Sequence, residues 1–121
     1  MSRGHRDIRL FIIDIMESIQ KIELYTHETS YEAFLKDDKT KDAVLRNLEV
    51  IGEAVRNLPE SVKEKYPDPE WKEAAGMRDR LIHEYFGVSY SIVWETVKND
   101  LPSFKRKIEQ VLEELQRESS E

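Results

Sequence analysis

Apolar residues recur along the first part of the chain at the spacing of one helical face. Five isoleucines step by four, three, four and three residues: Ile8, Ile12, Ile15, Ile19 and Ile22. This stepping forms a single stripe on an α-helix, which we expect to run from about residue 6 to residue 25. The polar stretch 27–41 that follows is interpreted as a loop that holds one short helical turn.

The same spacing predicts a second helix. Its stripe consists of Val44, Leu48, Ile51, Val55 and Leu58. The helix should stop before Pro59, because the residue that precedes a proline disfavours the helical conformation. Residues 59–69 are predicted to connect it to the next helix, with room for one helical turn at 61–66.

A third helix is predicted from its capping residues. Asp68 suits the N-cap and Pro69 the first helical position. Apolar residues continue to Tyr85, and Gly87 suits the C-terminal cap.

A fourth helical region is expected from Ser89 or Ser91 to about Leu115. Pro102 lies inside it and should kink or divide it, because proline removes one backbone hydrogen bond. Four amphipathic helices with short connections predict an all-α, antiparallel four- to five-helix bundle, as a single domain over residues 1–121. The first two stripes are richer than one core needs, which permits a homodimer.

Composition narrows the possible chemistry. The chain has no cysteine, which excludes disulfides, thiolate catalysis and thiolate zinc sites. A net charge of -6 argues against binding nucleic acid over the whole surface, but not against a local basic cleft, because charges are screened within about 10 Å. The most apolar run, residues 10–13, is far too short to span a bilayer. We therefore expect a cytoplasmic protein with no membrane partner.

One segment gathers residue types that can do chemistry. Arg78, Asp79, Arg80 and His83 place two cations, a carboxylate and a titratable imidazole within six residues. They fall near the end of the third predicted helix, where the helix dipole favours a protonated imidazole. The other two histidines show no metal-ligand spacing, so no metal site is expected. These residues alone are more typical of an ordinary solvated surface than of an active site.

Helical geometry makes specific predictions about this segment. Asp79 and His83 are four residues apart and should share one face, so that Asp79 can fix the imidazole tautomer. Arg78 and His83 are five apart, which separates them by roughly 140° around a regular helix and about 7.5 Å along it. Either the helix distorts here, or a second copy of the chain completes the site across a two-fold axis. Tyr85 should lie almost above Arg78.

The segment resembles the signature of the HEPN superfamily, which is an arginine, four to six residues, then a histidine. Here the signature is Arg78 and His83 with four residues between them, and His83-Glu84-Tyr85 is similar to the extension of the HepT toxin branch. Similar blocks at 46–54, 66–78 and 93–102 extend the resemblance over most of residues 7–115. The chain departs from the pattern at Asp79, where asparagine is common, and at Ser89, where aspartate is expected.

The resemblance implies an endoribonuclease that needs no metal or cofactor and acts as a homodimer, with Arg78 and His83 of both copies facing one cleft. The histidine would move the proton of the ribose 2′-hydroxyl, and the arginine would hold the charge of the phosphorane. Asp79 would orient His83 and Arg80 would hold backbone phosphate, unless these two form only a solvated ion pair. The resemblance also implies a toxin, silenced when a nucleotidyltransferase antitoxin transfers AMP to Tyr85.

Two other functions stay open. The chain could be a non-catalytic docking subunit or modification target of a nucleotidyltransferase, which the net charge of -6 favours. It could also be a structural helical dimer, in which neither Arg78 nor His83 affects RNA.

Overall fold

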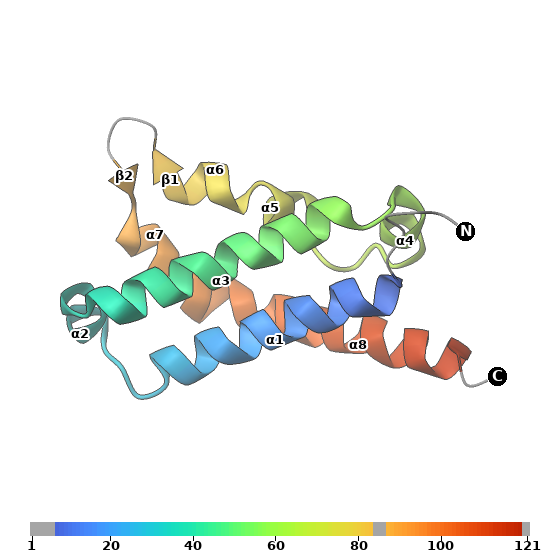
Figure 1. Ribbon diagram of the computed structural model, residues 1–121, viewed down its shortest axis with the longest axis horizontal. Helices are drawn as coiled ribbons and strands as arrows, with labels where there is room; N and C mark the ends of the chain where they lie inside the picture. The colour runs from blue at the N-terminus through green and yellow to red at the C-terminus, as the bar shows by residue number, and fades with distance from the viewer. Residues whose placement is uncertain (1–6, 84–86, 120–121) are drawn as a thin grey trace.

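The computed structural model describes residues 7–83 and 87–119, and over these residues the protein is almost entirely helical (Figure 1). In chain order the elements are α1 (Ile8–Thr26), α2 (Tyr31–Lys36), α3 (Asp38–Asn57), α4 (Glu60–Lys65), α5 (Trp71–Ala75), α6 (Met77–Leu81), β1 (Ile82–His83), β2 (Gly87–Val88), α7 (Tyr90–Glu95), the π-helix η1 (Thr96–Asp100) and α8 (Leu101–Ser119). The two strands form a two-stranded antiparallel hairpin. The predicted all-α class is therefore confirmed.

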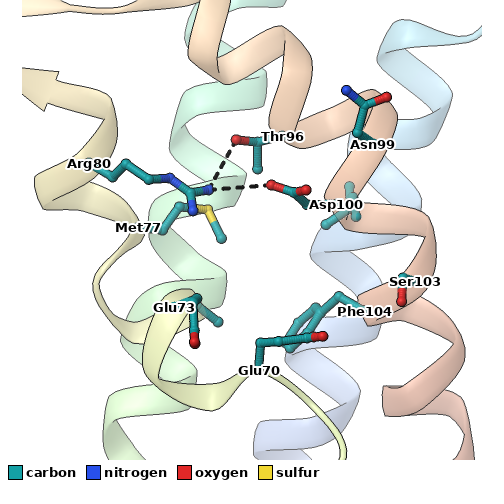
Figure 2. A pocket seen from close by; sticks show the side chains of 11 residues that line it. Glu70, Glu73, Met77, Arg80, Thr96, Asn99, Asp100, Ser103 and Phe104 are labelled. Carbon is teal, nitrogen blue, oxygen red and sulfur yellow. Dashed lines mark hydrogen bonds and ion pairs between the residues drawn. The ribbon is translucent and has the colours of Figure 1, made fainter.

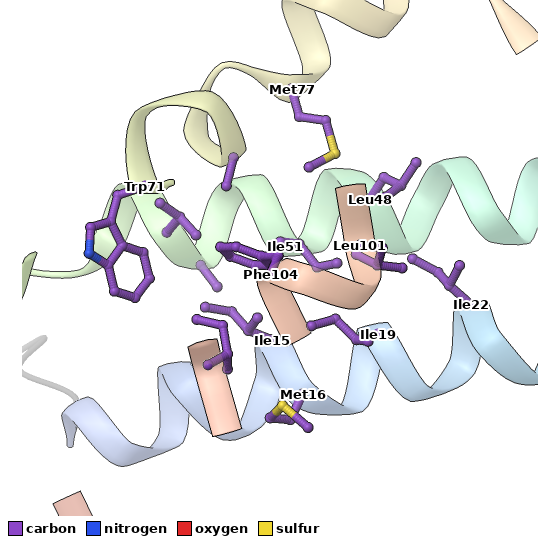
Figure 3. Close-up of a cluster of buried hydrophobic side chains, with 14 of the residues drawn as sticks. Ile15, Met16, Ile19, Ile22, Leu48, Ile51, Trp71, Met77, Leu101 and Phe104 are labelled. Atoms are coloured by element: carbon purple, nitrogen blue, oxygen red, sulfur yellow. The ribbon is translucent and has the colours of Figure 1, made fainter. Parts of the chain in front are cut away.

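Three long helices, α1, α3 and α8, form the frame of the molecule. Figure 1 shows α1 running antiparallel to both α3 and α8, and α1 packs against each of them. Figure 3 shows Ile15, Ile19 and Ile22 of α1 facing the side chains of α3 and α8. The predicted stripes are the core: Ile12, Ile15, Ile19, Ile22, Val44, Leu48, Ile51 and Val55 are fully buried. No described helix has the length and apolarity needed to cross a membrane.

The connection between the first two long helices is shorter than predicted. The expected helical turn is α2, but α3 already begins at Asp38, inside the stretch interpreted as a loop. The carboxylate of Asp37 caps α3, because it accepts from the backbone N–H of Thr40 at 3.1 Å and from its hydroxyl at 2.6 Å. The predicted end before Pro59 and the turn at α4 are both confirmed.

The third helix differs most from the prediction. It starts at Trp71 with Glu70 as its N-cap, two residues after the predicted cap at Asp68. It is interrupted at Gly76 and ends at Leu81, well before Tyr85, which lies outside the described residues.

Gly87, which was expected to cap the third helix, lies in strand β2 instead. Gly87 pairs with the backbone of His83 in the hairpin and has a φ of 74°, a left-handed conformation that glycine adopts without a Cβ penalty. The prediction that Gly87 caps a helix is therefore wrong, because Gly87 itself belongs to strand β2 and pairs with β1.

The fourth helical region begins at Tyr90 after Ser89, as predicted. The helical path continues through Pro102, but its hydrogen bonding widens to a π-helix over Thr96–Asp100, immediately before α8. In an α-helix the ring of Pro102 would clash with the carbonyl four residues earlier, and a wider turn relieves that clash. The proline thus changes the turn that precedes it.

Candidate functional site

Helix α6 directs its two arginines to opposite sides. Arg78 and Arg80 are two residues apart, which on a helix separates them by roughly 200°. Arg78 faces α3, where its Nε lies 3.8 Å from Glu49 Oε2, and its side chain is 59% exposed. Arg80 faces η1, where its Nη2 donates to Thr96 Oγ1 at 3.1 Å and lies 3.7 Å from Asp100 Oδ2 (Figure 2). The two cations therefore have different surroundings.

Arg78 lies at the edge of a cavity of about 400 Å³ between α1, α3 and the α5–α6 segment. Two further arginines of α3, Arg46 and Arg56, line the same cavity, together with Asp14, Glu49 and Glu53. Among the described residues neither Arg46 nor Arg56 forms an ion pair. Three arginines and three carboxylates therefore line this cavity.

These α3 residues were not predicted to take part in a site. Arg46, Glu49, Glu53 and Arg56 are spaced by three, four and three residues, which puts them on one face of a helix. That spacing was visible in the sequence. What it did not reveal is that this face lies against Arg78.

The predicted pairing of Asp79 with His83 on one helical face is wrong in its geometry. Helix α6 ends at Leu81, so the backbone of His83 belongs to β1 and pairs with Gly87. His83 follows the C-terminal end of α6 by two residues, so the expected influence of the helix dipole on its imidazole stays a prediction. Asp79 is exposed on α6. The directions of the His83 side chain and of Tyr85 lie outside the described residues.

The contacts of Arg80 join α6 to the π-helix. Thr96 is only 3% exposed, so its hydroxyl provides a fixed acceptor for Arg80. Asp100 adds a carboxylate at the other end of η1. A guanidinium with these two partners holds α6 in place, and fewer of its donors remain for a phosphate.

A second cavity, of about 330 Å³, opens beside Arg80 between α5–α6 and the η1–α8 region (Figure 2). At its rim, Glu70 accepts a hydrogen bond from Lys107 Nζ at 2.6 Å, and this contact lowers the pKa of the Glu70 carboxyl below its usual 4.5. Within the described part of the chain no three metal-ligating side chains gather closely enough to hold an ion.

Comparisons with known proteins place the chain among ribonucleases. Residues 15–111 match the model of a family described as "Ribonuclease HepT-like". The chain is 49% identical over 111 residues to "Probable ribonuclease HepT" of Thermococcus cleftensis, covering 92% of this chain and 98% of that one. It is 46% identical over 113 residues to "Putative RNase MJ0127" of Methanocaldococcus jannaschii, covering 93% of each. No solved structure matches it.

Proposed function

The chain belongs to the family of HepT-like ribonucleases, and on that premise we propose that it is an endoribonuclease whose catalytic residues are Arg78 and His83. The observation that carries this proposal is the position of Arg78. Its guanidinium is largely exposed, borders a cavity lined by two more arginines, and contacts one carboxylate at 3.8 Å. An arginine of this kind is available to bind a phosphodiester.

The proposed reaction uses the nucleophile of the RNA itself. His83 takes the proton of the ribose 2′-hydroxyl, or gives one to the 5′-oxygen that leaves, and the 2′-oxygen attacks the adjacent phosphorus. Arg78 donates hydrogen bonds to the phosphorane oxygens, where negative charge grows. The products are a 2′,3′-cyclic phosphate and a 5′-hydroxyl, and the reaction needs no metal.

The supporting residues act at different places in this proposal. Asp79, exposed on α6, is proposed to orient His83 across the turn from α6 into β1. Arg80 supports the site indirectly, because its guanidinium already contacts Thr96 and Asp100 of η1. Its role is to hold α6, which changes the earlier expectation that it binds phosphate.

We further propose that two copies of the chain form the active cleft and that the enzyme is a toxin. Arg78 and His83 are separated by the end of α6, and a second copy would bring another pair of these residues to one RNA strand. Transfer of AMP to Tyr85 by a nucleotidyltransferase antitoxin would add a negative phosphate two residues after His83. That phosphate could pair with Arg78 and block the substrate phosphate.

The decisive experiment incubates purified wild-type protein and His83→Ala with total RNA in the presence of a chelator. We expect wild type to cleave RNA and leave cyclic phosphates, and His83→Ala to lose on the order of 10² to 10⁴ in rate. A substrate with deoxyribose at the scissile position should resist. Cleavage of that substrate, or of DNA, would refute the mechanism.

Control by the antitoxin is tested with Tyr85→Phe. This variant should cleave RNA as wild type does and remain active when incubated with the nucleotidyltransferase and ATP. AMP found on another residue, together with silencing of Tyr85→Phe, would show that Tyr85 is not the target.

The net charge of -6 favours a second candidate, a docking subunit without nuclease activity. Expression of the chain alone distinguishes the two. A nuclease toxin arrests growth and His83→Ala relieves the arrest, whereas a docking subunit has no effect in either form.

A further inference from the structure

We propose that the cavity between α5–α6 and η1–α8 binds a nucleobase that presents N–H donors, guanine above all, and so selects the RNA sequence that is cleaved. Its role in selection rests on the proposed ribonuclease function, whereas base binding can be tested without cleavage. Figure 2 shows the cavity with the Arg80 contacts at one end and Glu70 and Glu73 at the other.

The floor of the cavity suits a flat apolar ring. Four buried side chains contribute to it: Ala74, Met77, Leu101 and Phe104. The volume of about 330 Å³ falls within the range of small-molecule sites, roughly 300–1,000 Å³. A base gains from covering apolar atoms with its faces, and a compact hydrated ion does not. The floor therefore favours a base over a phosphate or a metal ion.

The charges at the rim of the cavity also favour a base over a phosphate. Three carboxylates line the cavity, on Glu70, Glu73 and Asp100, against one guanidinium, on Arg80. That guanidinium is already engaged by Asp100 and Thr96. A phosphate entering here would meet a surplus of negative charge. A neutral ligand that donates hydrogen bonds is complementary to it.

Glu73 is the carboxylate best placed to receive those donors. Glu70 is held by Lys107, whereas Glu73 has no ion pair among the described residues and its side chain is exposed. Guanine carries N1–H and a 2-amino group side by side, and these match the two oxygens of one carboxylate. Asn99 and Ser103, on the η1–α8 side, can donate to the acceptors of the same base.

The cavity lies close enough to Arg78 that one RNA strand can contact both. Helix α6 carries Met77 and Arg80 to this cavity and Arg78 to the other side. A helix with its side chains is about 10 Å across, so a strand that binds Arg78 crosses one helix to reach the cavity. Single-stranded RNA is commonly read through splayed bases in this way.

The first experiment measures binding. The ligands are 2′-O-methyl oligouridines with one guanine or one inosine, which cannot be cleaved because the nucleophile is blocked. Binding is followed by the amide resonances of residues 70–80 and 96–104. We expect the guanine ligand to bind about tenfold tighter than the inosine ligand, which lacks the 2-amino donor. Glu73→Gln should remove this difference, and Glu113→Gln, the same charge change on an exposed part of α8, should keep it.

Other outcomes of the binding experiment overturn the proposal. Equal affinity for guanine and inosine would show that no donor edge is read. No shift at these amides would show that bases do not enter the cavity. Spermidine that binds the same amides more tightly than guanine would identify a site for polyamines instead.

The second experiment measures cleavage of an RNA with a randomised segment. Wild type should cut at a fixed distance from guanine. Glu73→Gln should lose this preference, because its cutting at guanine-positioned sites falls toward the rate at other sites, whereas Glu113→Gln should keep the wild-type pattern. If wild type cuts without any preference for guanine, this inference fails and the ribonuclease function stands. If neither protein cuts RNA but guanine still binds, the proposed function fails and the base site stands.

Discussion

The Nη2 atom of Arg80 donates a hydrogen bond to the buried Thr96 hydroxyl at 3.1 Å, which ties α6 to the first residue of the π-helix. The two residues are sixteen apart in sequence, so the contact joins the proposed catalytic segment to the helix that follows it. A π-turn within a helix is often found beside a functional site. Here it provides both contacts of Arg80, because Asp100 lies at its other end.

Replacing Asp100 with Asn should lower cleavage even though it removes a negative charge from a protein that binds RNA. Loss of the carboxylate weakens the hold of Arg80 on η1 and loosens α6. We expect kcat to fall by about fivefold at most, because an exposed ion pair of this kind contributes about 0.2–1 kcal/mol, with KM nearly unchanged. An increase in RNA affinity with unchanged kcat would instead mean that Asp100 acts only through its charge.

The salt dependence of RNA binding distinguishes a residue that only supports the site from one that contacts an RNA phosphate. Each phosphate contact with single-stranded RNA adds about 0.7 to the slope of log affinity against log salt. Because Arg80 is engaged by Thr96, we expect Arg80→Gln to leave this slope unchanged and Arg78→Gln to reduce it. Thr96→Val should likewise leave the slope unchanged, because the Thr96 hydroxyl accepts from Arg80.

Arg78→Ala should abolish most of the activity with little effect on stability. The side chain is 59% exposed and its only ion pair in the described structure is at 3.8 Å, so folding depends little on it. We expect a loss on the order of 10² to 10³ in kcat, as for the removal of one donor to a transition-state oxyanion. Arg78→Lys should retain only part of the cleavage activity, because an ammonium lacks the planar fork of hydrogen-bond donors that a guanidinium has. A thermal midpoint lowered along with the rate would point to a structural role.

Gly52→Val should both destabilise the fold and reduce activity. A Cβ at Gly52 of α3 would lie 3.1 Å from the backbone oxygen of Ala74, so a side chain pushes α5 away from α3. Overpacking of this kind typically costs about 1–3 kcal/mol. The shift would also move Arg78 from Glu49. Gly76→Ala is the control, because its Cβ would meet nothing closer than 3.4 Å, and it should be tolerated in chemical denaturation.

Acid should weaken the link between α8 and the residue before α5. The hydrogen bond from Lys107 holds the pKa of Glu70 below its usual 4.5. A carboxyl with a lowered folded-state pKa contributes stability above its unfolded pKa and loses that stability as pH falls through the folded value. Wild type should therefore lose more stability than Lys107→Gln between about pH 5 and about pH 3. Lys63→Gln, which removes an ammonium 3.8 Å from Glu60, should follow the wild-type curve.

The sequence by itself determined the long helices and their buried faces. The isoleucine stripe of α1 and the stripe of α3 are buried as predicted, because helical spacing is a local property that survives in any fold that covers one face. The end of α3 before Pro59 was readable for the same reason, since proline restricts the residue that precedes it. Arg78 and His83 were predicted as site residues through the resemblance of their segment to the HEPN signature, and their role stays a prediction.

Only the tertiary structure decided how the proposed catalytic segment is built. The predicted helix through Tyr85 stops at Leu81, because the next two residues pair with Gly87 and Val88, and pairing between strands is not encoded in helical spacing. No pattern in the sequence predicted that Glu49 would lie beside Arg78, or that Thr96 would accept a hydrogen bond from Arg80. These contacts join residues 16 to 29 apart, and packing of α6 between α3 and η1 creates them.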